Sequence, residues 1–290
     1  MFAITGITGQ VGGHVARALL AAGQAVRAVV RDEAKGRTWA ALGCDVAVAE
    51  MSDAAALRAA FTGVQGVFVL LPPHFDPSPD FGESRREIAA LHAALGEARP
   101  AKVVCLSTTG AQATQANLLN QLGLLEASLR RLPMPVAFLR AAWFIENSAW
   151  DIAPARNTGL MPSYLQPTDR RIPMVATEDV GRTAAALLQE DWQGQRIVEL
   201  EGPTRVSPDD IAASLSRLLG RDVRAQPVPR AHWEDLFSAQ GMNNPTPRAQ
   251  MLEGFNAGWL AFEGGACESR RGAVALDTVL RALVKRSSEA

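Results

Sequence analysis

The glycine-rich stretch near the amino terminus has the sequence Thr5-Gly6-Ile7-Thr8-Gly9-Gln10-Val11-Gly12. An apolar segment of strand length, Phe2–Thr5, precedes it, and a segment of helical period, Gln10–Ala22, follows it. A strand, a GxxGxxG turn and a helix in this order form the phosphate-binding end of a βαβ unit. The stretch therefore predicts a dinucleotide site in the first residues of the chain.

The three glycines of this turn have separate expected roles. Gly6 lets the chain turn off the strand, Gly9 lets backbone N–H groups approach a pyrophosphate, and Gly12 lets the helix pack closely on the sheet. The phosphates are expected at the helix amino terminus, where free N–H groups and the helix dipole favour negative charge. The predicted binding segment consists of Gly6, Ile7, Thr8, Gly9, Gln10, Val11 and Gly12.

The second apolar run, Ala25–Val30, is followed by Arg31, about twenty residues after the glycines. NAD-specific proteins tend to place an acidic residue there, on the adenosine ribose. A guanidinium at this position, with Lys35 in reach, can instead bind a 2′-phosphate, so NADP(H) is the predicted cofactor. NAD(H) is the alternative, in which Asp32 takes the ribose hydroxyl and Arg31 is a solvated surface residue.

Strand-length apolar runs alternate with helix-period segments as far as Arg140, which predicts parallel strands joined by crossover helices. The predicted fold class is α/β, a doubly wound parallel-sheet Rossmann domain with a smaller C-terminal α/β substrate lobe. Residues 1–152 and about 177–204 are assigned to the Rossmann domain, and about 153–176 and 205–290 to the smaller lobe. The expected strands of the main sheet are Phe2–Thr5, Ala25–Val30, Val46–Ala49, Gly66–Leu71, Ala101–Ser107, Val136–Arg140 and Arg196–Leu200.

Residues that follow the strands are further binding candidates, because ligands in open parallel sheets bind at the carboxyl ends of the strands. We expect Met51 on the adenine side, Leu71 and Pro72 beside the nucleotide, and Ser107 and Thr108 near the nicotinamide. Each of them, taken alone, is equally well explained as a turn or packing residue.

Charge and cysteine content exclude several classes of function. The formal net charge is −1, from 29 basic and 30 acidic residues, which leaves no basic face for nucleic acid and no polybasic membrane segment. Cys44, Cys105 and Cys267 form no CxxC or Cys/His cluster, so no metal site is expected and the thiols are expected to be reduced in a cytoplasmic protein. No apolar run reaches the roughly 18 residues of a membrane span.

Three further stretches carry a family resemblance. They are Leu139-Arg140-Ala141-Ala142-Trp143-Phe144-Ile145-Glu146-Asn147, Val175–Gly181 and Gly254–Trp259. Together with the glycine turn and Arg31, they resemble the NmrA-like branch of the atypical short-chain dehydrogenases/reductases. The resemblance implies a substrate cleft between a Rossmann domain and a small C-terminal lobe. It also implies an activity among quinone reductases, triphenylmethane dye reductases and non-catalytic sensors of the nicotinamide pool.

The acid–base pair of many short-chain dehydrogenases, a Tyr with a Lys four residues later, is absent. The only tyrosine is Tyr164, and the expected helix Asn117–Leu132 carries no Tyr, Lys or His. Leu122 stands where quinone-reductase-like relatives often have a His. Glu126 is the helix's single carboxylate and is expected to be a solvated helix acid, the alternative being a proton source by way of water. No catalytic residue is assigned.

The absent pair favours hydride transfer to an acceptor that is already strongly electrophilic, such as a quinone or a dye. Phe75, Trp143 and Phe144 are candidate apolar walls for such a substrate, and His74 or Asn147 could hydrogen-bond its oxygen. Trp143 and Phe144 as core residues, and His74 as a surface residue, are the alternatives. A non-catalytic redox sensor is the alternative function, and the protein is expected to be a monomer or a homodimer.

Overall fold

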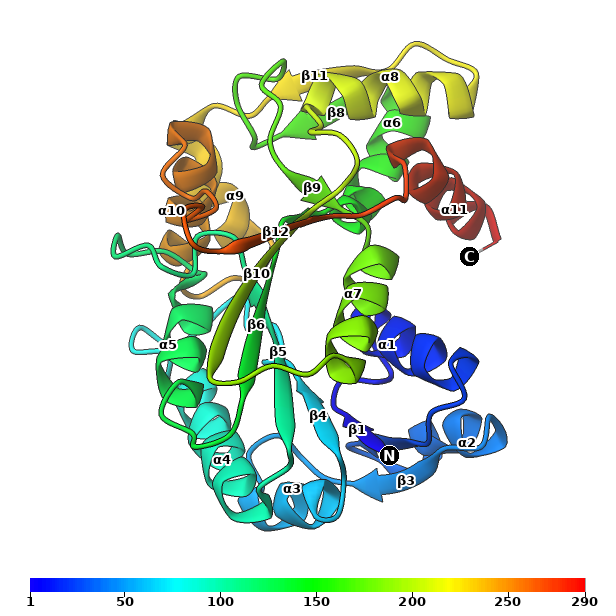
Figure 1. The fold of residues 1–290 in the computed structure, drawn as a ribbon. Coiled ribbons are helices and arrows are strands. Elements are labelled where there is room, and N and C mark those ends of the chain that lie inside the picture. The colour runs from blue at the N-terminus through cyan, green and yellow to red at the C-terminus, as the bar shows by residue number, and fades with distance from the viewer. Residues whose placement is uncertain (290) are drawn as a thin grey trace.

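Eight parallel strands form the central sheet of the computed structural model, which describes residues 1–289 (Figure 1). In sheet order the strands are β12 (Glu268–Arg271), β10 (Gln195–Glu201), β6 (Val136–Ala141), β5 (Lys102–Thr108), β4 (Gly66–Val69), β1 (Phe2–Ile4), β2 (Val26–Val30) and β3 (Asp45–Val48). The chain winds from β1 through β2 to β3 and then returns to β4 on the other side of β1. This reversal places the topological switch point, where doubly wound folds bind ligands, beside β1.

Helices cover both faces of the sheet. One face carries α1 (Gln10–Ala21), α2 (Glu33–Ala41) and α7 (Thr177–Gln189), and the other carries α3 (Ala54–Phe61), α4 (Gly82–Ala98) and α5 (Asn120–Leu129). The strands between them are almost continuously apolar because both of their faces are buried. The predicted doubly wound α/β class is confirmed.

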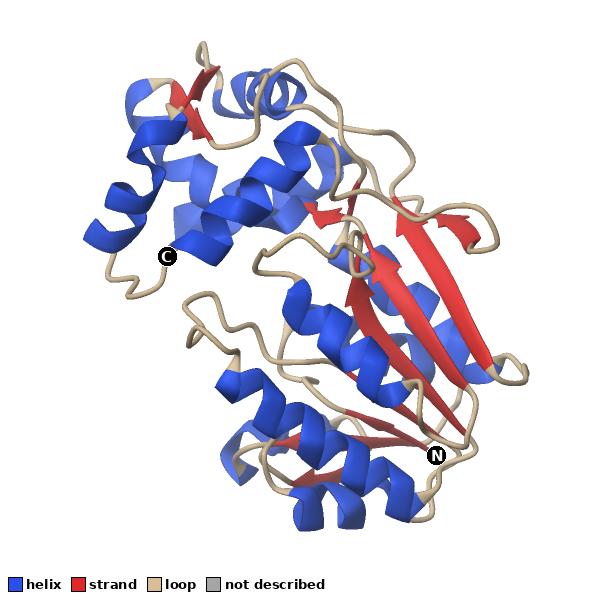
Figure 2. Ribbon diagram, turned by 90° about the vertical axis from the view of Figure 1, so that its left-hand side faces the viewer, coloured by secondary structure: helices blue, strands red, loops and turns tan. Residues whose placement is uncertain are grey.

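A smaller, mainly helical lobe lies beyond the carboxyl ends of the strands (Figure 2). Its core includes the fully buried Leu215 and Leu280. The helical elements are η1 (Ile145–Asp151), α6 (Ile152–Thr158), α8 (Pro208–Leu219), η2 (Arg230–His232), α9 (Trp233–Ala239), α10 (Thr246–Ala257) and α11 (Leu276–Glu289). Its short strand pairs are β7 (Trp143–Phe144) with β9 (Met174–Val175), and β8 (Leu160–Ser163) with β11 (Arg224–Pro227).

The outermost strand, β12, departs from the sequence-based division of the chain. Residues 205–290 were assigned to the smaller lobe, but Glu268–Arg271 pair with β10 in the main sheet. The Glu-Ser-Arg-Arg sequence gave no apolar signal, because an edge strand needs no buried side chains and is commonly protected by charges. Here Arg196 of β10 donates to the Glu268 carboxylate across the pair, at 2.6 and 2.9 Å.

The helix after β5 begins three residues later than Asn117, where the sequence pattern placed its start. The Asn117 side chain accepts a hydrogen bond from the Leu119 N–H at 2.7 Å, and the Asn117 N–H donates to the Asn120 side chain at 2.7 Å. These bonds hold residues 117–119 in a turn ahead of α5. Among the described helices, none combines the length and apolar character needed to cross a bilayer.

Candidate functional site

The glycine turn between β1 and α1 has two positions at which a side chain would collide with neighbouring atoms. Gly6 has a φ of +60°, and a Cβ atom there would lie 2.7 Å from Leu70 Cδ2. A Cβ atom at Gly12 would lie 2.3 Å from the Gly6 carbonyl oxygen. Only glycine fits these two positions, as the sequence predicted for a sharp turn and a closely packed helix.

The amino end of α1 is open to an anion. Gly9, the N-cap residue, supplies no side-chain hydrogen bond, and the first turn holds no acidic residue. The Gly9 N–H itself bonds to the Gly6 carbonyl at 2.9 Å. Within residues 1–289 the N–H groups of Gln10, Val11 and Gly12 have no backbone acceptor. Three free donors and the positive end of the helix dipole fit a pyrophosphate group.

The end of β2 presents cations rather than a free carboxylate. Asp32 caps α2, and its Oδ1 accepts the Ala34 N–H at 2.7 Å. Arg31 and Lys35 are exposed, and neither forms an ion pair within the described residues. Since the Asp32 carboxylate is already engaged, this geometry favours the 2′-phosphate of NADP(H) over the bare ribose of NAD(H).

A cavity of about 460 Å³ joins the glycine turn to α2. From the predicted binding residues it brings together Ile7, Thr8, Gly9, Gln10 and Lys35. Arg31 is not part of its lining. The remaining lining residues, which the sequence analysis did not propose, are Arg17, Thr38, Trp39 and Leu42. Arg17 follows the glycine turn at helical spacing, and Trp39 follows Lys35 at helical spacing. Neither residue type by itself indicates a nucleotide site, so the sequence does not identify them.

The other cofactor candidates follow neighbouring strands at the same edge of the sheet. Met51, after β3, is half-buried against the core on the side of α3. Leu71 is buried and Pro72 half-buried after β4. At the end of β5, Ser107 points to the face covered by α5, since its hydroxyl donates to Glu126, whereas Thr108 is half-exposed on the opposite face. Thr108 is therefore better placed than Ser107 to contact a ligand.

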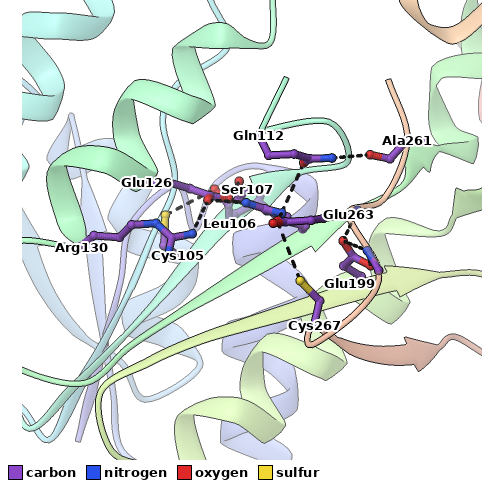
Figure 3. Close-up of polar contacts among 12 residues, drawn as sticks. Cys105, Leu106, Ser107, Gln112, Glu126, Arg130, Glu199, Ala261, Glu263 and Cys267 are labelled. Carbon is purple, nitrogen blue, oxygen red and sulfur yellow. Dashed lines mark hydrogen bonds and ion pairs between the residues drawn. The ribbon is translucent and has the colours of Figure 1, made fainter. Parts of the chain in front are cut away.

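A buried network of charges lies behind Ser107 (Figure 3). Arg140, at the end of β6, donates from Nε to Glu126 Oε1 and from Nη2 to Glu126 Oε2, both at 2.8 Å. The Ser107 hydroxyl donates to Glu126 Oε1 at 2.6 Å. The Arg140 Nη1 donates to Glu263 at 2.6 Å, in the segment that leads from α10 to β12. The network thus joins β5, α5 and β6 to a segment from the last part of the chain.

Glu126 is not the solvated acid that the sequence predicted. The residue is 3% exposed, and α5 presents it to Arg140 rather than to water. Burial alone would raise the pKa of its carboxyl, but the hydrogen bonds and charge of Arg140, with the Ser107 hydrogen bond, outweigh burial and lower the pKa. Glu126 therefore stays ionised near neutral pH and cannot act there as a proton donor.

The segment after β4 carries two of the substrate candidates. His74 Nε2 lies 2.8 Å from Glu87 Oε2 of α4, and the His74 carbonyl accepts a hydrogen bond from Gln121 of α5 at 3.2 Å. The imidazole is thus held against α4, and the His74 backbone against α5. Phe75 is 62% exposed. The next residue, Asp76, accepts hydrogen bonds from Asn243 and Asn244, which precede α10 in the smaller lobe.

The aromatic candidates are placed differently from one another. Trp143 packs edge-on against Phe255 of α10, with ring centroids 5.1 Å apart. Phe144 packs against the core beneath α1 and α7. Both are half-buried and support the packing alternative, whereas Asn147 on η1 is exposed. The single tyrosine, Tyr164, packs against Trp233 and Phe237 inside the smaller lobe.

Glu146 connects the smaller lobe to the glycine turn. Its carboxylate accepts hydrogen bonds from the Thr177 N–H at 2.9 Å and the Thr177 hydroxyl at 2.7 Å, and so caps α7 from a distant part of the chain. The same Thr177 hydroxyl lies 3.2 Å from the Gln10 side chain. Burial raises the pKa of Glu146, against the lowering effect of the Thr177 hydrogen bonds. These contacts join the stretch at residues 139–147 to the stretch at residues 175–181.

A doubly wound parallel sheet, a tight glycine turn and an uncapped first helix define a dinucleotide-binding protein of the Rossmann class. The family match is more specific. The NmrA-like family model matches residues 1–257, and the chain belongs to that family.

Two relatives cover most of the chain. The NAD(P)H azoreductase of Xenophilus azovorans is 26% identical over 243 residues, which is 83% of this chain and 82% of the relative. Quinone oxidoreductase 2 of Escherichia coli is 26% identical over 267 residues, which is 91% of this chain and 89% of the relative.

Solved structures agree with the fold. The Citrobacter sp. triphenylmethane reductase superposes with a TM-score of 0.75 at 22% identity, covering 100% of this chain and 99% of that one. The Escherichia coli NADPH-dependent quinone oxidoreductase, complexed with NADPH, superposes with a TM-score of 0.77 at 22% identity and the same coverage. At this identity the likeness shows the shared fold.

Proposed function

We propose that the protein is an NADP(H)-dependent reductase that transfers a hydride to a small conjugated electrophile such as a quinone or a dye. The observation that carries this proposal is the open amino end of α1 beside Arg31 and Lys35, two exposed cations without an ion-pair partner in the described chain. The family relationship supports it, since relatives are named as azoreductase and quinone oxidoreductase.

The cofactor fits the residues at the carboxyl edge of the sheet. The free N–H groups of Gln10, Val11 and Gly12 would bind the pyrophosphate, and Arg31 and Lys35 would bind the 2′-phosphate. Met51 would contact the adenine, Leu71 and Pro72 the middle of the nucleotide, and Thr108, with Ser107 behind it, the nicotinamide end. The bound dinucleotide supplies the hydride, and the protein supplies its orientation.

The side chains of α5 limit which acceptors the protein can reduce. Leu122 is apolar and packs against the core, and one turn later Glu126 is held ionised by Arg140. Neither side chain can deliver a proton to a carbonyl oxygen at neutral pH. A quinone or a cationic dye needs less assistance, because it accepts the hydride as a strong electrophile before any proton arrives.

We further propose that His74 protonates the reduced product. Hydride addition to a quinone leaves a hydroquinone anion, and one proton on its oxygen completes the reaction. The Glu87 carboxylate, 2.8 Å from Nε2, fixes the orientation of the ring. Phe75 and Asn147, both exposed, would lie against the acceptor, whereas Trp143 and Phe144 would shape the wall behind it.

The proposal is tested by following NADPH oxidation with the purified full chain and a panel of quinones, azo dyes and triphenylmethane dyes. Turnover with at least one class, with NADPH preferred over NADH, is expected. Arg31→Ala should reduce affinity for NADPH and leave affinity for NADH unchanged. Binding of NADPH without turnover of any acceptor would overturn the reductase assignment.

The alternative function, a non-catalytic sensor, has one observation in its favour, the absence of an acid–base pair on α5. Calorimetric titrations with NADP⁺ and NADPH separate the two functions. A sensor must bind the two redox forms with different affinities, because a ligand with equal affinity for two states shifts no equilibrium between them. Turnover combined with similar affinities for both forms would exclude the sensor.

A further inference from the structure

Cations without partners gather around the glycine turn. Arg17 of α1 and Lys35 of α2 are exposed, as is Arg31 before α2, and none of the three forms an ion pair with a carboxylate of residues 1–289. Many other arginines of the chain are paired, including the nearby Arg27, which binds Asp45 at 2.6 Å. An unneutralised group of positive charges at this position fits an anionic ligand.

Arg17 is directed toward the turn although it lies two helical turns along α1. Side chains on a helix lean toward its amino end, which brings residue 17 over residue 13. A Cβ atom at Gly13 would lie 3.1 Å from Arg17 Nη2, so the guanidinium uses the space that the glycine leaves free. This contact gives a role to the one glycine of the segment that lies outside the GxxGxxG pattern.

Trp39 holds the Arg17 side chain from the other helix. The guanidinium carbon lies 5.7 Å from the centre of the indole ring, a cation–π distance. Trp39 is itself 6% exposed and is part of the core, so the ring is a fixed surface for the cation. Arg17 is therefore positioned without an ion pair to any carboxylate of residues 1–289, and its N–H donors have no partner in that part of the chain.

Arg17 and Lys35 line the same cavity of about 460 Å³ as Thr8, Gly9 and Gln10. The cavity opens between α1 and α2 at the turn, and two cations from different helices line it. A phosphate monoester carries between one and two negative charges at neutral pH, which Arg17 and Lys35 together can neutralise.

We propose that Arg17 is a specificity-determining residue that binds the 2′-phosphate of NADP(H) together with Lys35. This inference rests on the proposed cofactor, and it adds a cation from α1 to the pair expected at the end of β2. Arg31, which is not part of the cavity lining, then approaches the same phosphate from the outside.

The test measures binding to the full chain by calorimetry, with 2′,5′-ADP and 5′-AMP as probes that differ in the 2′-phosphate. Arg17→Ala should lower the affinity for 2′,5′-ADP by about tenfold, the loss expected for a charge-assisted hydrogen bond, and leave the affinity for 5′-AMP within about twofold. Arg37→Ala removes an exposed cation of α2 that lies outside the cavity lining, so it should change neither affinity.

A second variant keeps the guanidinium but displaces it. Gly13→Ala should weaken binding of 2′,5′-ADP selectively, and the same change should have no further effect in the Arg17→Ala background. Circular dichroism of each variant establishes that it is folded.

The results distinguish a wrong role for Arg17 from a wrong cofactor assignment. Wild-type affinity of Arg17→Ala for 2′,5′-ADP, or equal losses for both probes, overturns the role of Arg17. If Arg31→Ala alone shows the selective loss, the role of Arg17 is overturned and the proposed cofactor stands. Failure of the wild-type chain to bind NADPH or 2′,5′-ADP overturns the proposed function itself.

Discussion

Arg140 and Glu126 form a bidentate ion pair, with two N–H···O bonds of 2.8 Å, at a depth where the side chains are 2% and 4% exposed. Removing one partner of such a pair leaves the other charge buried without compensation, which typically costs about 3–5 kcal/mol. Glu126→Gln should therefore lower the free energy of unfolding by about 3 kcal/mol, since Glu263 still faces Arg140. Urea denaturation measures this change.

The double variant Glu126→Leu/Arg140→Met is the control for that prediction. Apolar residues of similar volume remove both charges together, so this variant should be more stable than either single variant. A Glu126→Gln protein as stable as the wild type would show that the pair contributes nothing to folding.

The Gly12 position allows no side chain. Because a Cβ atom there would lie 2.3 Å from the Gly6 carbonyl oxygen, Gly12→Ala should cost about 2 kcal/mol of stability through overpacking and should abolish NADPH binding. Gly9→Ala is the matched change, since its Cβ atom would lie 3.3 Å from the same oxygen and its φ is −88°. Thermal melts should show a clearly smaller loss for Gly9→Ala, and equal losses would contradict the geometry.

The His74–Glu87 pair should control a proton transfer. Replacing His74 by Gln removes the donor, so turnover with a quinone should fall while the KM for NADPH stays the same. Glu87→Gln should reduce kcat in the same direction and increase the solvent deuterium isotope effect, because the imidazole loses its orienting carboxylate. His92→Gln, at a histidine of α4 that bonds to Ser128 of α5, is the control. Unchanged kcat in His74→Gln would exclude this proton donor.

Asp76 ties the segment after β4 to the smaller lobe. It accepts the Asn243 N–H at 2.9 Å and the Asn244 N–H at 2.7 Å, and these bonds lower the pKa of its carboxyl. Asp76→Ala should accelerate hydrogen exchange at residues 243 and 244. Asp80→Ala, in the same segment, should leave that exchange unchanged, because Asp80 bonds to Ser78 and Gly82. Protection from exchange that persists in Asp76→Ala would show that these hydrogen bonds do not hold residues 243 and 244 in place.

Asp151 should make stability depend on pH. Burial raises its pKa from 3.8 to about 7, so the folded protein binds this proton more tightly than the unfolded chain does. The stabilisation is complete below the unfolded pKa and is lost as the pH rises through about 7. Asp151→Asn should match the wild type near pH 4 and exceed it near pH 8 by about 2 kcal/mol, a value reduced for partial exposure. Denaturation at both pH values checks this, and parallel curves would contradict it.

The parts of the fold that the sequence predicts correctly are those with local signals. Buried parallel strands are continuous apolar runs, and the glycine turn needs residues that are adjacent in the chain, so β1, α1 and β2 were placed within a residue or two. The edge strand β12 was missed because its charged residues gave no apolar signal, and β10 provides its only strand neighbour within the described chain.

The site is less predictable because its partners are distant in sequence. Glu126 meets Arg140 and Glu263 from separate elements, and no spacing rule links these positions. One sequence feature indicates that Glu126 is buried: the flanking leucines at 124, 125 and 129 surround it with apolar residues. No sequence feature predicts the role of Arg17, because its position depends on the space left by Gly13 and on Trp39 in another helix.

The contact between α1 and α7 links the two ends of the molecule. A Cβ atom at Gly181 would lie 2.3 Å from His14 Cβ, so the backbones of the two helices are in close contact at this point. The amino end of α7 is capped by Glu146, from the start of the smaller lobe, and the amino end of α1 faces the cofactor. The α1–α7 pair is therefore a continuous packed connection between the dinucleotide site and the start of the smaller lobe.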